Sequence, residues 1–168
     1  VEVERDPDPG IIYRGPLAVL VDRNSASASE IFAGAMQDYG RGLIIGEPTF
    51  GKGTVQTLID LNRYVPGSED DLGRLRLTMA EFFRVSGGST QLRGVEPDII
   101  FPTAEHIADH GERSLDNPLP WGSIHPAVYD RAAPTDVDRL RERSRRRTAR
   151  DPGFEMLSAR ERVLRELD

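Results

Sequence analysis

The sequence predicts an α/β fold, with one βαβ unit inside a mixed sheet followed by a mainly helical C-terminal region. Residues 17–21 form a continuous apolar run bounded by Pro16 and Asp22, as expected of a fully buried strand. A stretch of helical periodicity follows, and residues 43–45 are again a short apolar run. Strands joined by a helix in this way pair in parallel, through a right-handed crossover.

The composition narrows the classes of function. With 168 residues, the chain is sized for one domain with a smaller appendage. Its net charge of -6 argues against a nucleic-acid partner. It has no cysteine, which excludes disulfides and cysteine-based zinc sites. No apolar run reaches the roughly 18 residues of a membrane-spanning helix, and there is no signal-peptide pattern at Val1.

The helix of the βαβ unit is expected to begin just after Asn24. Ser27 and Glu30 stand three residues apart, which is the spacing of a capping box. Gly40 is placed to end the helix, because glycine readily adopts the left-handed conformation after a last turn. Its core-facing stripe is predicted to consist of Ile31, Phe32, Ala35 and Met36.

Beyond this unit the pattern predicts further strands. Residues 54–59 are strand-like, and residues 74–79 alternate apolar and polar side chains, as in a strand with one solvated face. Residues 62–73 between them read as a charged loop. Residues 94–102 are bounded by prolines and predict an edge strand.

After Pro102 the sequence becomes more polar. We expect helical structure within residues 104–113, a helix with a solvated face over 135–150, and an amphipathic helix over 154–167. Trp121, the only tryptophan, is expected to dock this region on the core. The expected divisions are an N-terminal loop over 1–14, a core over 15–103 and a mostly helical region over 104–168.

One lysine stands out. Lys52 is the only lysine in the chain, and the other 21 of the 22 basic residues are arginine. Lysine, unlike arginine, can lose its proton and act as a base. A serine hydroxyl needs such a base to become a nucleophile, and burial or a nearby helix N-terminus favours the neutral amine. We therefore interpret Ser27 as a nucleophile and Lys52 as its base, with backbone N–H groups at the helix start able to bind an oxyanion.

Other interpretations of the same stretch fit less well. Residues 46–52 match a phosphate-binding loop up to the lysine, but Gly53 replaces the Ser or Thr that would bind Mg²⁺, and a strand rather than a helix is expected next. A Ser-His-Asp triad lacks its G-x-S-x-G elbow. The histidines all lie in the polar tail, where no third ligand completes a metal site, so no metal or cofactor is expected; they are His106, His110 and His125.

Several motifs carry a family resemblance. The runs S-A-S-A-S-E at residues 25–30 and G-K-G-T-V-Q at residues 51–56, with G-G-S-T-Q at 87–91 and G-V-E-P-D-I at 94–99, resemble those of the C-terminal processing peptidases, family S41. Within that family the chain is most similar to the bacterial tail-specific proteases, and the likeness covers most of residues 15–160. The resemblance implies part of a ClpP/crotonase-like peptidase core.

The resemblance also implies roles for individual residues. Ser27 would be the nucleophile, Lys52 the base 25 residues later, and Gln56 the residue that orients the base. Ala28 would supply one oxyanion N–H, and a glycine upstream of the nucleophile strand the other. Four residues of strand separate Lys52 from Gln56 by roughly 13 Å, so direct contact would need the segment from Gly51 to Gly53 to be kinked.

The resemblance implies a serine endopeptidase that cleaves proteins near exposed C-termini, located in the periplasm of a Gram-negative bacterium and peripheral to the inner membrane. The substrate-binding PDZ module and the upstream glycine strand have no counterpart in these 168 residues. We therefore expect a C-terminal fragment that is inactive when isolated. The alternative is a folded, non-catalytic fragment that acts only by association.

Overall fold

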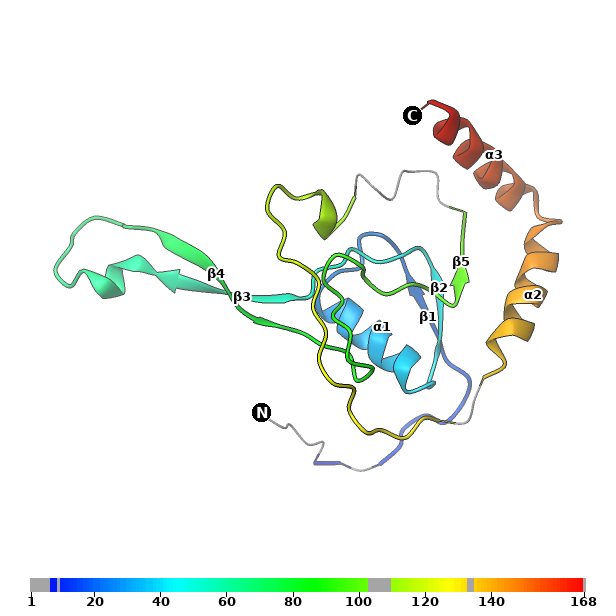
Figure 1. The fold of residues 1–168 in the computed structure, drawn as a ribbon, viewed down its shortest axis with the longest axis horizontal. Coiled ribbons are helices and arrows are strands. Elements are labelled where there is room, and N and C mark those ends of the chain that lie inside the picture. The colour runs from blue at the N-terminus through cyan, green and yellow to red at the C-terminus, as the bar shows by residue number, and fades with distance from the viewer. Residues whose placement is uncertain (1–6, 9, 103–109, 133–134, 168) are drawn as a thin grey trace.

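The computed structural model describes residues 7–8, 10–102, 110–132 and 135–167. Its helices and strands follow the predicted order (Figure 1). They are β1 Ala18–Val21, α1 Ala28–Asp38, β2 Leu43–Gly46, β3 Thr54–Asp60, β4 Arg74–Glu81, β5 Ile99–Ile100, α2 Val137–Thr148 and α3 Pro152–Leu167. Two short 3-10 turns cover Leu61–Tyr64 and Glu112–Ser114. Each helix of the described ranges is too short or too polar to cross a bilayer.

The predicted βαβ unit is present. β1 and β2 pair in parallel with Val19 opposite Ile44, and β5 pairs in parallel with β2, which gives a three-stranded sheet in the order β1-β2-β5. β5 is therefore an edge strand, as the prolines around it predicted. A small core of four buried residues lies where α1 packs against this sheet; its members are Val21, Ala33, Ile44 and Val95.

Two predictions of burial are wrong. Leu20 of β1 is 75% exposed, because β1 lies at the sheet edge and α1 packs near only one face. On α1 the buried face contains Ala33 and Gly34, while Ile31 and Phe32 are 37% and 52% exposed. Ala33 contributes to the core and Gly34 lies against the Arg84 side chain. Of the predicted stripe, Met36 is half-buried and packs against the core.

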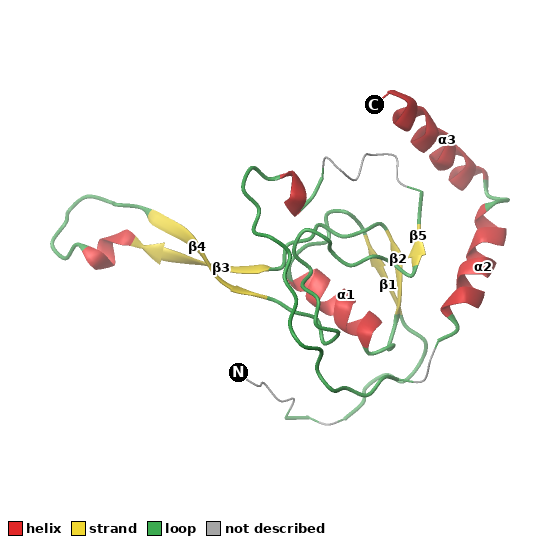
Figure 2. Cartoon of the chain, viewed as in Figure 1, coloured by secondary structure: helices red, strands yellow, loops and turns green. Residues whose placement is uncertain are grey.

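A two-stranded arm projects from this body (Figures 1 and 2). β3 and β4 form an antiparallel pair, and a register shift between Val55 and Gln56 introduces a bulge. The predicted alternation on β4 is correct, but Leu75, Leu77 and Met79 are 42–63% exposed. The arm has only two strands and extends away from α1, so nothing in the described chain covers its apolar side.

The C-terminal region wraps around the core. Trp121 donates a hydrogen bond from Nε1 to the Ser89 carbonyl oxygen over 2.9 Å, and the Arg93 guanidinium lies 3.7 Å from its ring centroid. The predicted docking role of Trp121 is thus confirmed. Helices α2 and α3 follow, as predicted, and Phe154 of α3 contacts Phe101 edge-on at 5.2 Å. Most of the helix expected within residues 104–113 lies outside the described residues.

Candidate active site

Ser27 lies in an unusual backbone turn immediately before α1. Its dihedral angles are φ 57° and ψ -116°, a conformation that costs a residue with a side chain about 1–3 kcal/mol and is concentrated at functional sites. The Ser29 N–H donates to the Ala26 carbonyl oxygen over 3.2 Å and closes the turn. The turn presents Ser27, which is half-buried, at the point where the helix begins.

Ala28, the first residue of α1, is exposed. Within the described chain its N–H has no acceptor, in contrast to the Ser29 and Glu30 N–H groups, which donate to Ala26 and Ser27 carbonyl oxygens. An unpaired backbone N–H beside a serine hydroxyl is the kind of donor that stabilises an oxyanion in acyl transfer.

The two glycines around Lys52 are required by close packing. Gly51 has φ +90°, a conformation that favours glycine. At Gly53 a Cβ would lie 2.5 Å from the Gln91 backbone nitrogen. The Gly53 N–H also donates to the Gln91 side-chain oxygen over 2.9 Å. The loop that carries Lys52 is thereby held against residues 89–94.

Glu30 links the Ser27 turn to the Lys52 loop. Its side chain is fully buried, and Oε2 accepts the N–H of Ser27 at 2.8 Å and of Lys52 at 2.9 Å. Oε1 accepts the Gly51 N–H at 2.7 Å and the Thr49 hydroxyl at 2.5 Å. The predicted capping box is therefore present, but the same carboxylate also fixes a loop about 20 residues away.

Three of the four residues assigned by resemblance, Ser27, Lys52 and Gln56, line one pocket of about 370 Å³, and Ala28 is not among its lining residues. Lys52 is half-buried and donates from Nζ to the Thr54 carbonyl oxygen over 3.1 Å. Gln56 donates instead to the Thr78 hydroxyl at 3.5 Å. Among the described residues, no hydrogen bond joins these three side chains to one another. The structure thus brings them into a common pocket without a hydrogen bond between them.

The alternative sites are not supported by the geometry. Lys52 is followed by β3 and not by a helix, so the phosphate-loop arrangement is absent. His110 is part-buried, packs edge-on against Phe50 at 5.7 Å and contacts the Arg23 carbonyl oxygen at 3.1 Å. His125 is exposed, and His106 lies outside the described residues. No group of three potential metal ligands occurs within the described ranges.

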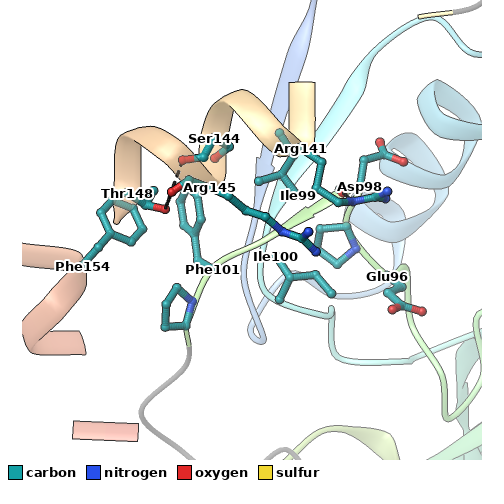
Figure 3. Close-up of a pocket in the computed structure, with 12 residues that line it drawn as sticks. Glu96, Asp98, Ile99, Ile100, Phe101, Arg141, Ser144, Arg145, Thr148 and Phe154 are labelled. Carbon is teal, nitrogen blue, oxygen red and sulfur yellow. Dashed lines mark hydrogen bonds between the residues drawn. The ribbon is translucent and has the colours of Figure 1, made fainter. Parts of the chain in front are cut away.

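A different pocket, of about 400 Å³, lies between β5 and the C-terminal helices (Figure 3). Arg141 and Arg145 line it from α2, and Glu96 and Asp98 from the segment before β5. Arg141 donates from Nε to the Asp98 carbonyl oxygen over 3.1 Å. None of the assigned site residues lines this pocket, so it reflects how the helices pack on the core.

Sequence reasoning missed the residues that support the site. Gln91 is fully buried; besides accepting from Gly53 it donates to Glu112 and to the Leu119 carbonyl oxygen, each over 3.1 Å. Thr49 donates to Glu30 and accepts the Val95 N–H at 2.7 Å. The G-G-S-T-Q motif is visible in the sequence, but nothing in its spacing indicates that its glutamine supports the Lys52 loop.

Comparison with known proteins gives two family matches. The model of peptidase family S41 matches residues 2–101. A second model, described as the C-terminal domain of tail-specific protease, matches residues 106–168.

Individual relatives agree with these matches. The chain is 44% identical over 171 residues to the tail-specific protease of Haemophilus influenzae, covering 99% of this chain and 25% of that protein. It is 49% identical over 85 residues to a carboxy-terminal-processing protease of Bartonella bacilliformis, covering 51% of this chain and 18% of that one. A solved photosystem II D1 C-terminal processing protease is 44% identical, with a TM-score of 0.44, over 51% of this chain and 20% of its own. The chain thus spans about a quarter or less of the length of these relatives.

Proposed function

The chain belongs to peptidase family S41, and from this membership we propose that the pocket shared by Ser27, Lys52 and Gln56 is the catalytic part of a serine endopeptidase. The observation that carries the proposal is the joint placement of Ser27 and Lys52 in one pocket, with both backbones held by the Glu30 carboxylate. One relative is named a carboxy-terminal-processing protease and another a tail-specific protease, so the proposed substrates are proteins with exposed C-termini.

In the proposed reaction, neutral Lys52 takes the hydroxyl proton of Ser27 as the serine oxygen attacks the peptide carbonyl carbon. The Ala28 N–H donates to the resulting oxyanion. Lys52 then gives the proton to the departing amine, which leaves an ester on Ser27. The Lys52 amine next takes a proton from a water molecule as that water attacks the ester carbonyl carbon, and it returns the proton to the Ser27 oxygen as the ester bond breaks and the carboxylic acid product is released. The role of Gln56 is to orient the lysine amine.

Lys52→Arg tests this assignment in the complete protein. Arginine keeps the charge and loses the ability to accept a proton, and a general base contributes about 10²–10⁴ in rate. We expect peptidase activity to fall by that factor while the circular dichroism spectrum is unchanged. Arg63→Lys, at the exposed end of the arm, exchanges the same two residue types and should leave activity unchanged. Normal turnover in Lys52→Arg would overturn the assignment.

Further parts of the proposal concern the whole protein. We place the peptidase core at residues 15–103 and a helical region at 104–168, in a protein of the Gram-negative periplasm peripheral to the inner membrane. A PDZ module and an upstream strand outside this chain would complete the site. β1, at the sheet edge with Leu20 exposed, supports a strand being added there.

The isolated chain is then expected to have negligible activity, because one missing oxyanion donor alone costs about 10²–10³ in rate. The second candidate function, action by association alone, predicts no cleavage by the complete protein either. A casein or tagged-peptide cleavage assay on both forms separates the two.

A further inference from the structure

The β3–β4 arm has two unlike faces. Side chains alternate along each strand, and Leu75, Leu77 and Met79 lie on one face of β4. Arg76 and Thr78 lie on the other, opposite Leu58 and Gln56 of β3. The pocket that contains Ser27 and Lys52 continues along this second face and is lined there by Leu58 and Arg76. The arm thus extends the candidate active site outward by several residues.

Arg76 differs from its neighbours on the arm. It is exposed, and no carboxylate of the described chain lies within ion-pair distance of it. Arg74, two residues earlier on the same face, lies 3.9 Å from Asp60. An exposed arginine alone indicates nothing about ligands. Arg76, however, shares a pocket with the proposed nucleophile and base, and its guanidinium fork matches the geometry of a carboxylate.

We propose that Arg76 binds a carboxylate of the peptide substrate, and so determines specificity for the reaction proposed above, on which this inference rests. Thr54, the first residue of β3, and Leu58, opposite Arg76, both line the pocket. Four strand residues span about 13 Å. Thr54 lies beside the proposed base, because its carbonyl oxygen accepts from the Lys52 amine. A substrate extended along the arm has the same rise per residue, so its carboxylate lies about three or four residues from the bond that is cleaved. It belongs either to an acidic side chain or to the substrate's own C-terminus.

The test compares peptides that differ only in this carboxylate. One series moves a single Glu, against Gln, through five positions on each side of the cleavage site. Another compares free and amidated C-termini placed three or four residues beyond the cleaved bond. In the complete protein we expect kcat/KM to favour the carboxylate peptide about threefold to fivefold at low salt, as for an exposed ion pair. The preference should appear in KM and weaken as salt is added.

Two substitutions locate the effect. Arg76→Gln should reduce the ratio to about one, while Arg76→Lys should retain part of it. Arg74→Gln removes an equal charge from the same strand and the same face, outside the pocket, and should preserve the ratio. The inference is wrong if wild type shows no preference in either series, or if the preference survives Arg76→Gln.

Binding measurements separate this inference from the proposed function. In a Ser27→Ala background, fluorescence anisotropy of labelled peptides gives Kd without cleavage. Preferential binding that Arg76→Gln removes would support the inference even if wild type cleaved nothing, and in that case only the peptidase proposal would fail. Cleavage without Arg76-dependent binding would leave the peptidase proposal standing and refute the role of Arg76. If the complete protein neither cleaved the peptides nor bound the carboxylate peptide preferentially, both the peptidase proposal and the role of Arg76 would be refuted.

Discussion

Glu30→Gln replaces one carboxylate oxygen with an NH₂ group and should strongly destabilise this chain. The carboxylate is fully buried and accepts four hydrogen bonds, three from backbone N–H groups and one from the Thr49 hydroxyl. Glutamine has one side-chain oxygen in place of two. Its NH₂ group must therefore replace either Oε1 or Oε2.

The least costly orientation places the NH₂ at the Oε1 position. The Thr49 hydroxyl can then rotate to accept from it, but the Gly51 N–H faces a donor. An unsatisfied buried donor costs about 1–3 kcal/mol, and each of the remaining two bonds weakens by about 1 kcal/mol when its acceptor loses its charge. We expect the free energy of unfolding to fall by about 3–5 kcal/mol.

Urea unfolding monitored by the fluorescence of Trp121, the only tryptophan, measures this loss. Glu112→Gln is the matched control. Glu112 is also buried, but among the described residues its carboxylate accepts one hydrogen bond, from Gln91, and an amide oxygen can accept the same bond. We expect that variant to lose less than about 1 kcal/mol. Equal losses in the two variants would refute the argument that Glu30 holds the two segments together.

Three further outcomes follow from the geometry. Gly53→Ala places a Cβ 2.5 Å from the Gln91 backbone nitrogen, so urea unfolding should show a loss of about 1–3 kcal/mol or more; unchanged stability would contradict the packing described. The Ser25 hydroxyl, donating to Asp22 over 2.9 Å, lowers the pKa of that carboxyl. Because the folded pKa is below the unfolded one, this stabilisation is present above about pH 4 and is lost as pH falls; Asp22→Asn should flatten the acid limb of stability against pH, and an unchanged limb would remove Asp22 as its source. In the complete protein, replacing all three histidines with glutamine should leave the dependence of kcat/KM on pH unchanged, because none of the described histidines lines the pocket of Ser27 and Lys52; a limb of that profile that vanished with the histidines would indicate a histidine base.

The sequence predicted the order and type of most elements, because apolar runs, alternation and capping residues act over short distances. It predicted burial less well. Leu20 is apolar within an apolar strand, and Phe32 belongs to a helical stripe, yet both are more than half exposed. Burial depends on which layers cover an element, and that information is not contained in the element's own pattern.

The same distinction applies to the site. The types of Ser27 and Lys52 were informative on their own, because a lone lysine between glycines suggests a base. Glu30 was recognised only as a cap, through a three-residue spacing. Its bonds to Gly51 and Lys52 go to backbone N–H groups, which every residue except proline carries, so no side-chain pattern could reveal them. The support that Gln91 gives to Gly53 was hidden for the same reason.

Glu30 also explains how a strained turn persists at Ser27. The φ of 57° costs about 1–3 kcal/mol, and the bond from the Ser27 N–H to a buried carboxylate contributes a stabilisation of similar size. The same oxygen holds the Lys52 N–H, so the backbones of the proposed nucleophile and the proposed base shift together when that carboxylate is altered. Changes at Glu30 should therefore lower stability and kcat in parallel. Arg76 lies on the arm and takes no part in the backbone hydrogen bonds of the Ser27 turn or the Lys52 loop. Changes at Arg76 should therefore alter KM alone.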